Sequence, residues 1–381
     1  MRLGVLVRIL ASMMALAAMR PAIAQQTLQS GRYTLTTEGC VNITSAIGDG
    51  FIVGAAGDLD DVRADLALRL LGQFKNDNGP DLGLRLVVES SPEDRLDLAE
   101  ASVLLFGSHG RLEIGDRQGL PDVLTGYAPN NFSFTGAEFG PASGPSLDPG
   151  GGLQHAFVPA ALAAQLNELS VLGASATLAN DRSAKAVYVS PKSHGFLAGL
   201  SYAVDADDPR FGSLAQAGLV HEKYWDSNIL RLGGSASLAS GTDRATTRVR
   251  DLHSVNVGAT LILNYDLMLG ISGTWNGSSG TVIDSASPAT SGAFGITTSV
   301  NYNRGRWTYG GYLQSATSEG DVRLPGNDRL TAMEVGASYR LNTKFRVYAA
   351  WYRFEFSDDG ERGEWGRTDG NQFLFGLRAA L

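Results

Sequence analysis

Apolar and polar residues alternate along most of this chain with the two-residue period of a β-strand. The alternating segments are about ten residues long, which is longer than most strands of soluble β proteins and typical of strands that cross a membrane. In residues 255–263, Val255 and Val257 lie on one face, whereas Asn256 and Thr260 lie on the other. The second face is small, polar or charged in segment after segment. The pattern therefore predicts a barrel with lipid outside and water inside.

Five alternating segments precede a long interruption and eleven follow it. The five are residues 31–41, 62–74, 80–89, 96–106 and 111–116. Residues 42–61, which are rich in Gly, Asp and Asn, are expected to form a loop. After the interruption, segments 182–190 and 213–224 rest on spacing more than on alternation. The sequence predicts an all-β fold, a transmembrane antiparallel β-barrel of about 16 strands.

The connections also alternate in length after the interruption. Short turns such as 264–266 and 303–305 are followed by longer polar loops such as 277–291. Short turns at one end and long loops at the other are typical of outer-membrane barrels. This order of connections supports the barrel independently of the strand pattern.

Residues 118–182 interrupt the alternation. The first part is rich in proline and glycine, and residues 159–178 are rich in alanine and leucine, which is compatible with a short helix. An irregular stretch of this length inside a regular β pattern is usually functional. We expect it to fold into the lumen as an inserted constriction loop, which we call the insert.

The N-terminus has the pattern of a secretory signal. Arg2 and Arg8 belong to a basic region around a short apolar core, and Ala22-Ile23-Ala24 offers a small-residue cleavage site before Gln25. The apolar core is too short to span a bilayer, for which about 20 residues are needed. We expect residues 1–24 to be a signal peptide and residues 25–381 to be one barrel domain.

Charge and composition exclude several classes of function. The chain has 39 acidic and 31 basic residues, and an acidic exported protein is a poor partner for nucleic acid. Cys40 is the only cysteine, so neither an intramolecular disulfide nor a cysteine metal cluster is expected. The five histidines lack metal-ligand spacing, and the sequence has neither a Gly-x-Ser-x-Gly elbow nor a phosphate loop. We expect no enzyme activity, no metal and no cofactor.

Three stretches resemble the general porins of the Gram-negative outer membrane. Residues 186–202, which include Tyr188-Val-Ser190-Pro191, are similar to the porin hairpin in which Tyr-x-Ser-Pro precedes a strand of glycine and aromatic residues. Residues 106–118 resemble the strand pair that leads into the porin constriction loop, and residues 373–381 resemble the porin C-terminus. The chain departs from the family at Leu381, where porins usually end in Phe.

The resemblance covers essentially all of the chain after the signal. It implies a homotrimer of barrels with about sixteen strands each, in contact with outer-membrane lipid and lipopolysaccharide. It also implies passive diffusion of small hydrophilic solutes and ions through a water-filled channel.

In the porin pattern, acidic residues of the inward-folded loop face arginines on the opposite wall, and the field between them orients passing solutes. Carried onto this sequence, the pattern gives six pore-constriction residues and, less directly, Arg63. The six are Arg69, Arg85 and Arg111 on lumen-facing strand positions, and Asp122, Glu138 and Asp148 on the insert. The alternative is that these are ordinary surface charges, because alternation fixes the facing of a side chain but not its height.

Two further features point to the membrane boundary. Five aromatic residues are candidates for the girdles at the lipid headgroups, where the outward ones are expected to lie; they are Trp275, Tyr339, Tyr348, Tyr352 and Phe373. The alternative is that strand propensity alone enriches aromatic residues here. Asp205, Asp207 and Asp208 could bind a divalent ion that bridges lipopolysaccharide, and a solvated loop is the alternative.

Two other classes of protein compete with the channel. One is a soluble exported β protein, such as a carbohydrate-binding module or a glycosidase, which would show exposed aromatic platforms or a close carboxylate pair. It does not explain strands with apolar residues outside and polar residues inside. The other is an outer-membrane enzyme or adhesin built on a barrel, which would normally have fewer strands or an extra domain.

Overall fold

In the computed structural model the described part of the chain is built almost entirely of β-strands. The structure describes residues 25–49, 62–90, 96–120, 124, 181–207, 211–244, 247–248, 250–277, 293–319, 327–357 and 367–380. The strands are β1 (Gln25–Ser30), β2 (Tyr33–Asp49), β3 (Val62–Phe74), β4 (Asp81–Ser90), β5 (Leu96–Gly107), β6 (Gly110–Asp116), β7 (Ala184–Val189), β8 (Phe196–Ala203), β9 (Phe211–Trp225), β10 (Asn228–Gly241), β11 (Asp243–Arg244), β12 (Thr247–Arg248), β13 (Leu252–Leu263), β14 (Leu267–Gly277), β15 (Ala293–Arg304), β16 (Trp307–Glu319), β17 (Asn327–Arg340), β18 (Phe345–Ser357) and β19 (Arg367–Ala380).

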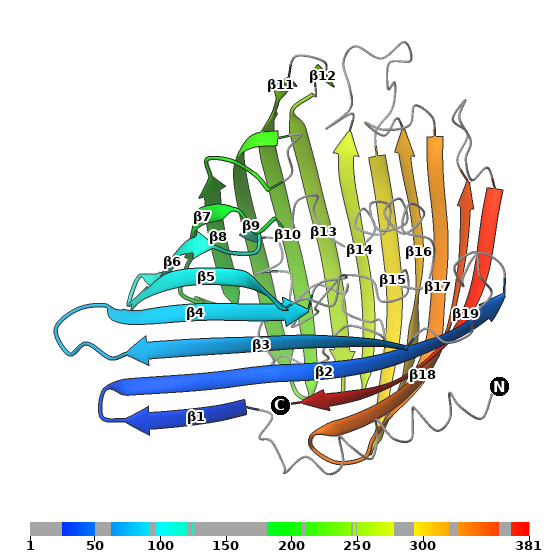
Figure 1. Cartoon of the computed structure of the whole chain (residues 1–381), viewed down its shortest axis with the longest axis horizontal. Helices are drawn as coiled ribbons and strands as arrows, with labels where there is room; N and C mark the ends of the chain where they lie inside the picture. Colours follow the sequence, from blue (N-terminus) through cyan, green and yellow to red (C-terminus); the bar gives the residue numbers. More distant parts are fainter. Residues whose placement is uncertain are drawn as a thin grey trace.

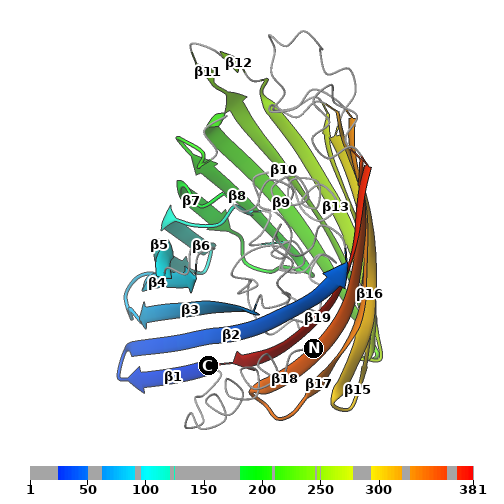
Figure 2. The ribbon, with the colours of Figure 1, turned by 45° about the vertical axis from the view of Figure 1, so that its right-hand side comes forward.

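Sixteen of these strands pair edge to edge in a ring. From β2 to β10 and from β13 to β19, each strand is antiparallel to the next, and β10 pairs directly with β13. The last strand, β19, pairs with β2, from Cys40 opposite Ala380 to Asp49 opposite Asn371. In Figures 1 and 2, β2 to β5 cross the direction of β13 to β17 on the other side, as tilted strands of a barrel do. The predicted antiparallel β-barrel is confirmed.

The strand β1 brings the sheet to seventeen strands, one more than predicted. It pairs with residues 33–38 of β2, and β3 occupies the other edge of β2 over residues 33–45. β1 and β19 therefore follow one another along the same edge of β2. The short strands β11 and β12 form a separate pair beyond β10 (Figure 1).

The start of the barrel differs from the sequence-based prediction. The first predicted strand covered residues 31–41, whereas the structure has β1 before a turn and a β2 that continues to Asp49. Residues 42–49 are therefore strand rather than loop, because they complete the pairing with β19. Residues 50–61 lie outside the described part. The two segments predicted from spacing, 182–190 and 213–224, correspond to β7 and β9.

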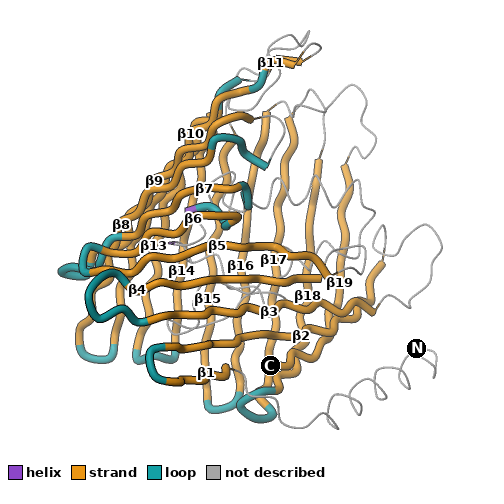
Figure 3. The backbone as a smooth tube through the Cα atoms, turned by 60° about the vertical axis from the view of Figure 1, so that its left-hand side comes forward, coloured by secondary structure: helices purple, strands orange, loops and turns teal. Residues whose placement is uncertain are grey.

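The short turns lie along one rim of the barrel, which we call the short-turn rim (Figure 3). Examples are residues 226–227, 264–266 and 305–306, each of which joins two paired strands. Asn264 and Tyr265 have φ angles of 51° and 60°, the positive values that the tight turns of hairpins require. The other connections, including the insert between β6 and β7, leave from the opposite rim.

The faces of the strands are reversed relative to a soluble protein. On β15, the apolar Ile296 and Val300 are exposed on the outside, whereas Thr297, Ser299 and Asn301 are buried on the inside. Leucine, valine and aromatic side chains are exposed in the same way on strands from β4 to β19. A belt of exposed apolar side chains around a polar interior suits a barrel surrounded by lipid.

No helix among the described residues is long and apolar enough to span a membrane.

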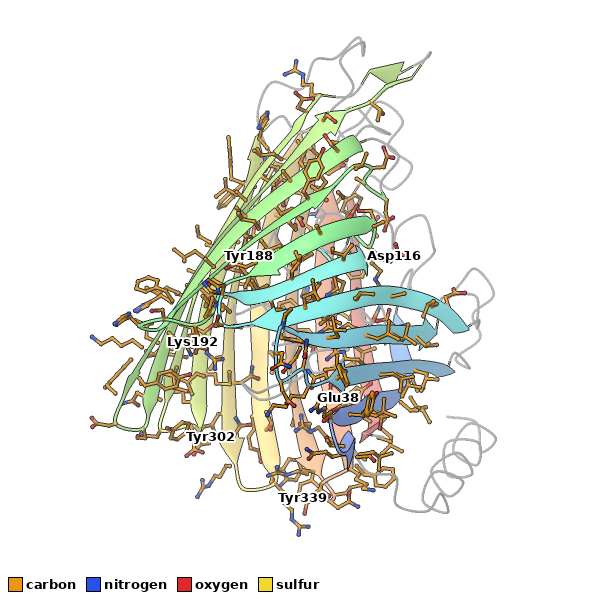
Figure 4. All side chains as sticks on the ribbon, turned by 90° about the vertical axis from the view of Figure 1, so that its left-hand side faces the viewer. Glu38, Asp116, Tyr188, Lys192, Tyr302 and Tyr339 are labelled. Carbon is orange, nitrogen blue, oxygen red and sulfur yellow. The ribbon has the colours of Figure 1, made fainter. Side chains whose placement is uncertain are left out.

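Of the aromatic residues expected in the girdles, two are exposed and one packs on an exposed tryptophan. Trp275 and Phe373 are exposed on the outside. Tyr339 packs on Trp307, with ring centroids 4.8 Å apart, and Trp307 stacks on Tyr309 at 5.7 Å. Figure 4 places Tyr302 and Tyr339 near the lower ends of their strands, at the short-turn rim. Aromatic side chains therefore gather on the outside at the short-turn rim, whereas Trp275 lies near the other end of β14.

For Tyr348 and Tyr352 the girdle prediction is wrong. Both are buried, and Tyr352 lies opposite Glu334 and Gln372, which are also fully buried. Both faces of β18 carry large side chains, because Trp351 alternates with Tyr352. Alternation therefore separates the two faces but does not decide which one is outside, and the register with β17 and β19 decides it.

Candidate functional site

Ionisable side chains gather on one part of the inner barrel surface, which we call the charged wall. It comprises the inward-facing ionisable residues of β2 to β7 and of the chain at either end of the insert. These are Glu38, Arg69, Arg85, Glu89, Glu100, Arg111, Glu113, Arg117, Asp181 and Lys185. Within each strand these side chains point into the barrel together, because residues two apart in sequence lie on the same face of a β-strand.

Glu113 on β6 is the centre of the charged wall. It is 0% exposed, and its carboxylate meets three guanidinium groups. Arg85 Nη1 lies 3.3 Å from Oε2, Arg117 Nε lies 3.0 Å from Oε2, and Arg111 Nε lies 2.8 Å from Oε1. One buried carboxylate shared by three cations is stable only while the set is complete, because each member compensates the desolvation of the others.

Arg117 follows directly after β6 and is 1% exposed. Its Nη1 donates to both carboxylate oxygens of Glu100 on β5, at 2.9 Å each, while its Nε donates to Glu113. Hydrogen bonds between ionised partners are about twice as strong as neutral ones. Arg117 therefore joins β5 and β6 at the point where the insert begins.

Gly115 shapes the backbone just before Arg117. Its φ is 138°, and a Cβ there would lie 2.2 Å from the carbonyl oxygen of Ala101. No other residue type fits this conformation without strain. The glycine therefore allows β6 to stay against β5 up to the position from which Arg117 reaches Glu100.

The predicted strand arginines lie on the same wall. Arg85 and Arg111 share Glu113, and Arg69 Nη1 lies 3.2 Å from Glu38 Oε2. The backbone of Arg63 pairs with Thr44, and its side chain is not among those described. Asp122, Glu138, Asp148 and the 159–178 segment lie outside the described residues, as does the signal at 1–24.

Sequence reasoning missed Glu100, Glu113 and Arg117 as members of the site. A signal was present for two of them, because Arg111, Glu113 and Arg117 are separated by even numbers of residues and so share a face. Arg117 lies beyond the end of the predicted strand. Glu100 is brought to it by the pairing of β5 with β6, which places Ala101 opposite Asp116.

The beginning of the insert packs on the inner surface of β7 to β9. Leu120 and Leu124 are buried in a cluster with Val187, Val189 and Val220. The backbone N–H of Leu120 donates to Gln216 Oε1 at 2.9 Å. The first residues of the insert therefore lie against the wall, inside the barrel.

The end of the insert is tied to the wall by charges. Lys185 Nζ lies 2.6 Å from Asp181 Oδ1, and Arg182 Nη2 lies 2.6 Å from Glu89 Oε2. The backbone N–H of Arg182 donates to Asp207 Oδ2 at 2.7 Å. Asp207 thus anchors the chain here. No group of three potential metal ligands occurs among the described residues, and Asp208 lies outside them.

The opposite part of the barrel interior has a different chemistry. On β13 to β16, which we call the uncharged wall, the buried polar side chains of the described residues are hydroxyls and amides. They are Ser254, Asn256, Thr260, Ser272, Thr274, Asn276, Thr297, Ser299, Asn301, Thr308 and Gln314. Asn256 Nδ2 donates to Thr274 Oγ1 at 2.7 Å across the β13–β14 pair.

A separate ionic cluster lies close to the short-turn rim. Glu222 on β9 lies 2.7 Å from Arg231 Nε on β10, accepts a hydrogen bond from Tyr224 at 2.8 Å, and pairs with Lys192 of the β7–β8 turn. The hydrogen bond to Glu222 raises the pKa of Lys192. In Figure 4, Lys192 and Asp116 mark opposite ends of this side of the barrel.

Solved outer-membrane proteins share this fold at low sequence identity. The anion-selective porin from Comamonas acidovorans matches with a TM-score of 0.59 at 14% identity, over 92% of this chain and 100% of that chain. OmpT, an outer membrane protein of Vibrio cholerae, matches with a TM-score of 0.58 at 13% identity, over 93% and 99%. The trimer form of OmpT gives 0.57 at 12% identity, over 91% and 99%.

No curated protein sequence matches the chain. A family model described as Gram-negative porin matches residues 10–359. The match takes in most of the sequence, from the predicted signal to the region of the last hairpin. The chain belongs to the Gram-negative porin family.

Proposed function

We propose that this outer-membrane protein is a passive, water-filled channel for small hydrophilic solutes and ions, and that it is not an enzyme. The observation that carries the proposal is the reversed barrel of a chain from the porin family. Apolar side chains cover the outside, and many charged, hydroxyl and amide side chains lie on the inner face of β2 to β7 and of β13 to β16. A polar interior lowers the cost of moving a hydrated solute through the apolar layer of the membrane.

Selectivity is assigned to the charged wall facing the insert. Arg69, Arg85 and Arg111 supply positive charge on the wall, and the acidic residues Asp122, Glu138 and Asp148 of the insert are proposed to face them. Fixed charges of opposite sign across a narrow neck create a field that favours ions and dipoles of one orientation. The described arginines are close to wall glutamates, so the field depends on the balance of the whole set.

We further propose that the barrel works as a homotrimer in contact with lipid and lipopolysaccharide. The support is the trimer form of OmpT, a protein of the same fold. The alternative of a soluble exported β protein is contradicted by the family and by the exposed apolar belt.

Reconstitution in planar bilayers tests the channel. The purified folded protein is expected to produce discrete conductance steps, and a salt gradient then gives a reversal potential. Arg69→Ala and Arg85→Ala each remove one positive charge and are expected to shift the reversal potential toward cation selectivity. Thr297→Ala on the uncharged wall is the matched control and should leave the reversal potential unchanged.

Two results would count against these proposals. Folded barrels that give no conductance steps would exclude the channel. Wild-type conductance and reversal potential in both arginine variants would exclude the assignment of selectivity to the charged wall.

A further inference from the structure

We propose that Arg117 is a positioning residue that fixes where the insert begins and couples that position to the charge of the lumen. The inference rests on the proposed channel function. It concerns a residue outside the predicted constriction set and two leucines that follow it. Arg117 acts through ionic contacts, the leucines act through packing, and both affect conduction.

The ionic part is a clamp between two strands and the first residue after them. Arg117 is almost fully buried and holds both Glu100 of β5 and Glu113 of β6, at 2.9 Å and 3.0 Å. A buried guanidinium with two carboxylate partners has a narrow choice of position, because moving away from either one loses a buried ionic hydrogen bond. The backbone at residue 117 is thereby held close to the wall.

The packing part is a pair of notches made by glycine. Gly199 on β8 and Gly218 on β9 present no side chain at the positions where Leu120 and Leu124 pack. A Cβ added at Gly199 would lie 2.7 Å from Leu120 Cδ1, and a Cβ added at Gly218 would lie 2.6 Å from Leu124 Cδ1. Both distances are shorter than real Cβ atoms show, so a methyl group added at either glycine would displace the end of the leucine side chain.

The clamp and the notches act on the same short stretch of chain. The clamp ties its start to β5 and β6, and the notches tie its next residues to β8 and β9. The Leu120 N–H also donates to Gln216 on β9, which adds a polar contact to the same stretch of chain. The direction in which the chain enters the lumen is therefore set by described contacts on five neighbouring strands, β5 to β9.

The consequence for conduction follows from the sharing of Glu113. Arg85, Arg111 and Arg117 all lie against this carboxylate, so the residue that places the insert also neutralises part of the wall. Loss of the Arg117 charge leaves the two carboxylates with less compensation and also frees the start of the insert. A change at this residue should therefore alter ion selectivity and conductance together.

The test compares variants by single-channel recording and reversal potential in planar bilayers, after the folded barrel is verified by its heat-sensitive mobility on gels. Arg117→Met is expected to shift the reversal potential toward cations and to change the single-channel conductance. Arg117→Met combined with Glu100→Gln removes one charge of each sign. It should return the reversal potential toward the wild-type value while the conductance stays altered.

The notches are tested without any change of charge. Gly199→Ala and Gly218→Ala should alter the single-channel conductance and leave the reversal potential nearly unchanged. Gly233→Ala on β10 is the matched control, because it is an inward glycine whose added Cβ would meet its nearest neighbour at an ordinary 3.7 Å. It is expected to conduct like the wild type.

Three outcomes overturn the inference. The first is an unchanged conductance in Arg117→Met, since a shift in reversal potential alone would make Arg117 a simple lumen charge. The second is a conductance in both notch variants equal to that of Gly233→Ala, a comparison that stands even where Arg117→Met does not fold. The third is a double variant whose conductance returns to the wild-type value together with its selectivity. A wild-type protein without channels would instead remove the proposed function itself.

Discussion

The charged wall and the uncharged wall face the same lumen from similar strands, and they satisfy their buried polar groups by different means. On β3 to β6, carboxylates and guanidinium groups compensate one another, with Glu113 shared among three arginines. On β13 to β16 the buried polar groups are amides and hydroxyls, and Asn256 donates a neutral hydrogen bond to Thr274. The difference teaches that the strand pattern determines which side chains face inward, while their chemistry determines how strongly they depend on one another.

The two walls differ in how much stability is lost when one partner of a buried polar contact is removed. A neutral hydrogen bond contributes about 1 kcal/mol to stability, whereas the loss of one partner from a buried ion pair costs about 3–5 kcal/mol. The charged wall should therefore be the more fragile of the two walls toward substitution. It is also the wall at which the insert begins and ends.

The largest expected effect is that of Glu113→Gln. The change keeps the shape of the side chain but leaves Arg85, Arg111 and Arg117 without their shared carboxylate, so we expect a loss of about 3–5 kcal/mol in the free energy of unfolding. Urea titration of the folded barrel followed by tryptophan fluorescence measures it. A loss no larger than that of Thr274→Val on the uncharged wall would remove the distinction between the walls.

A smaller effect is expected from placing a charge on the uncharged wall. Asn256→Asp is nearly isosteric, but the new carboxylate has no donor to replace the amide N–H groups now given to Thr274 and to the carbonyl of Gly273. Burying it there should cost about 2–3 kcal/mol. The same urea titration reports the cost, and Asn256→Ser serves as the uncharged control. Equal stability of the two variants would show that this wall tolerates charge as well as the other does.

The smallest effect is expected at the short-turn rim, where Lys192 pairs with Glu222 but is about half exposed. Lys192→Met should cost less than about 1 kcal/mol, because water screens an exposed ion pair. The pKa of Lys192 is raised above its ordinary 10.5, so this contribution is fully present at neutral pH and is lost as the pH rises through the raised value. Urea titrations of wild type and variant at pH 7 and above pH 11 check the sign. A difference that grows with pH would contradict it.

Much of the fold could be predicted from alternation, and the exceptions have physical causes. The face of β15 was unambiguous because Ile296 and Val300 alternate with Thr297 and Ser299. The face of β18 was not, because Trp351 and Tyr352 are both large and aromatic. The strand β1 was missed because Gln25-Gln26-Thr27 has no apolar alternation and is strand only through its pairing with β2.

For the candidate site, the sequence predicted which arginines face the lumen but not which carboxylates they pair with. Facing alone placed Arg69, Arg85 and Arg111 in the lumen. Their partners depend on the relative shift of neighbouring strands, and the β4–β5 register shifts between Val87 and Val88. One extra residue in a ladder changes which side chains become neighbours. The meeting of Arg117 with Glu100 therefore follows from the assembled sheet and from no local motif.

The edge of β2, which receives β19 and β1 in succession, has a consequence for how the barrel is made. Cys40 pairs with Ala380, so the ring closes only between the two ends of the polypeptide. Contacts between such distant parts form slowly, because the chain must lose its loop-closure entropy before they contribute. Until then β2 and β19 carry unpaired backbone groups, which are templates for pairing with other molecules. Pairing of β19 with β2 therefore both closes the ring and removes the exposed strand edges that favour aggregation. A chain truncated before β19 cannot close its ring in this way.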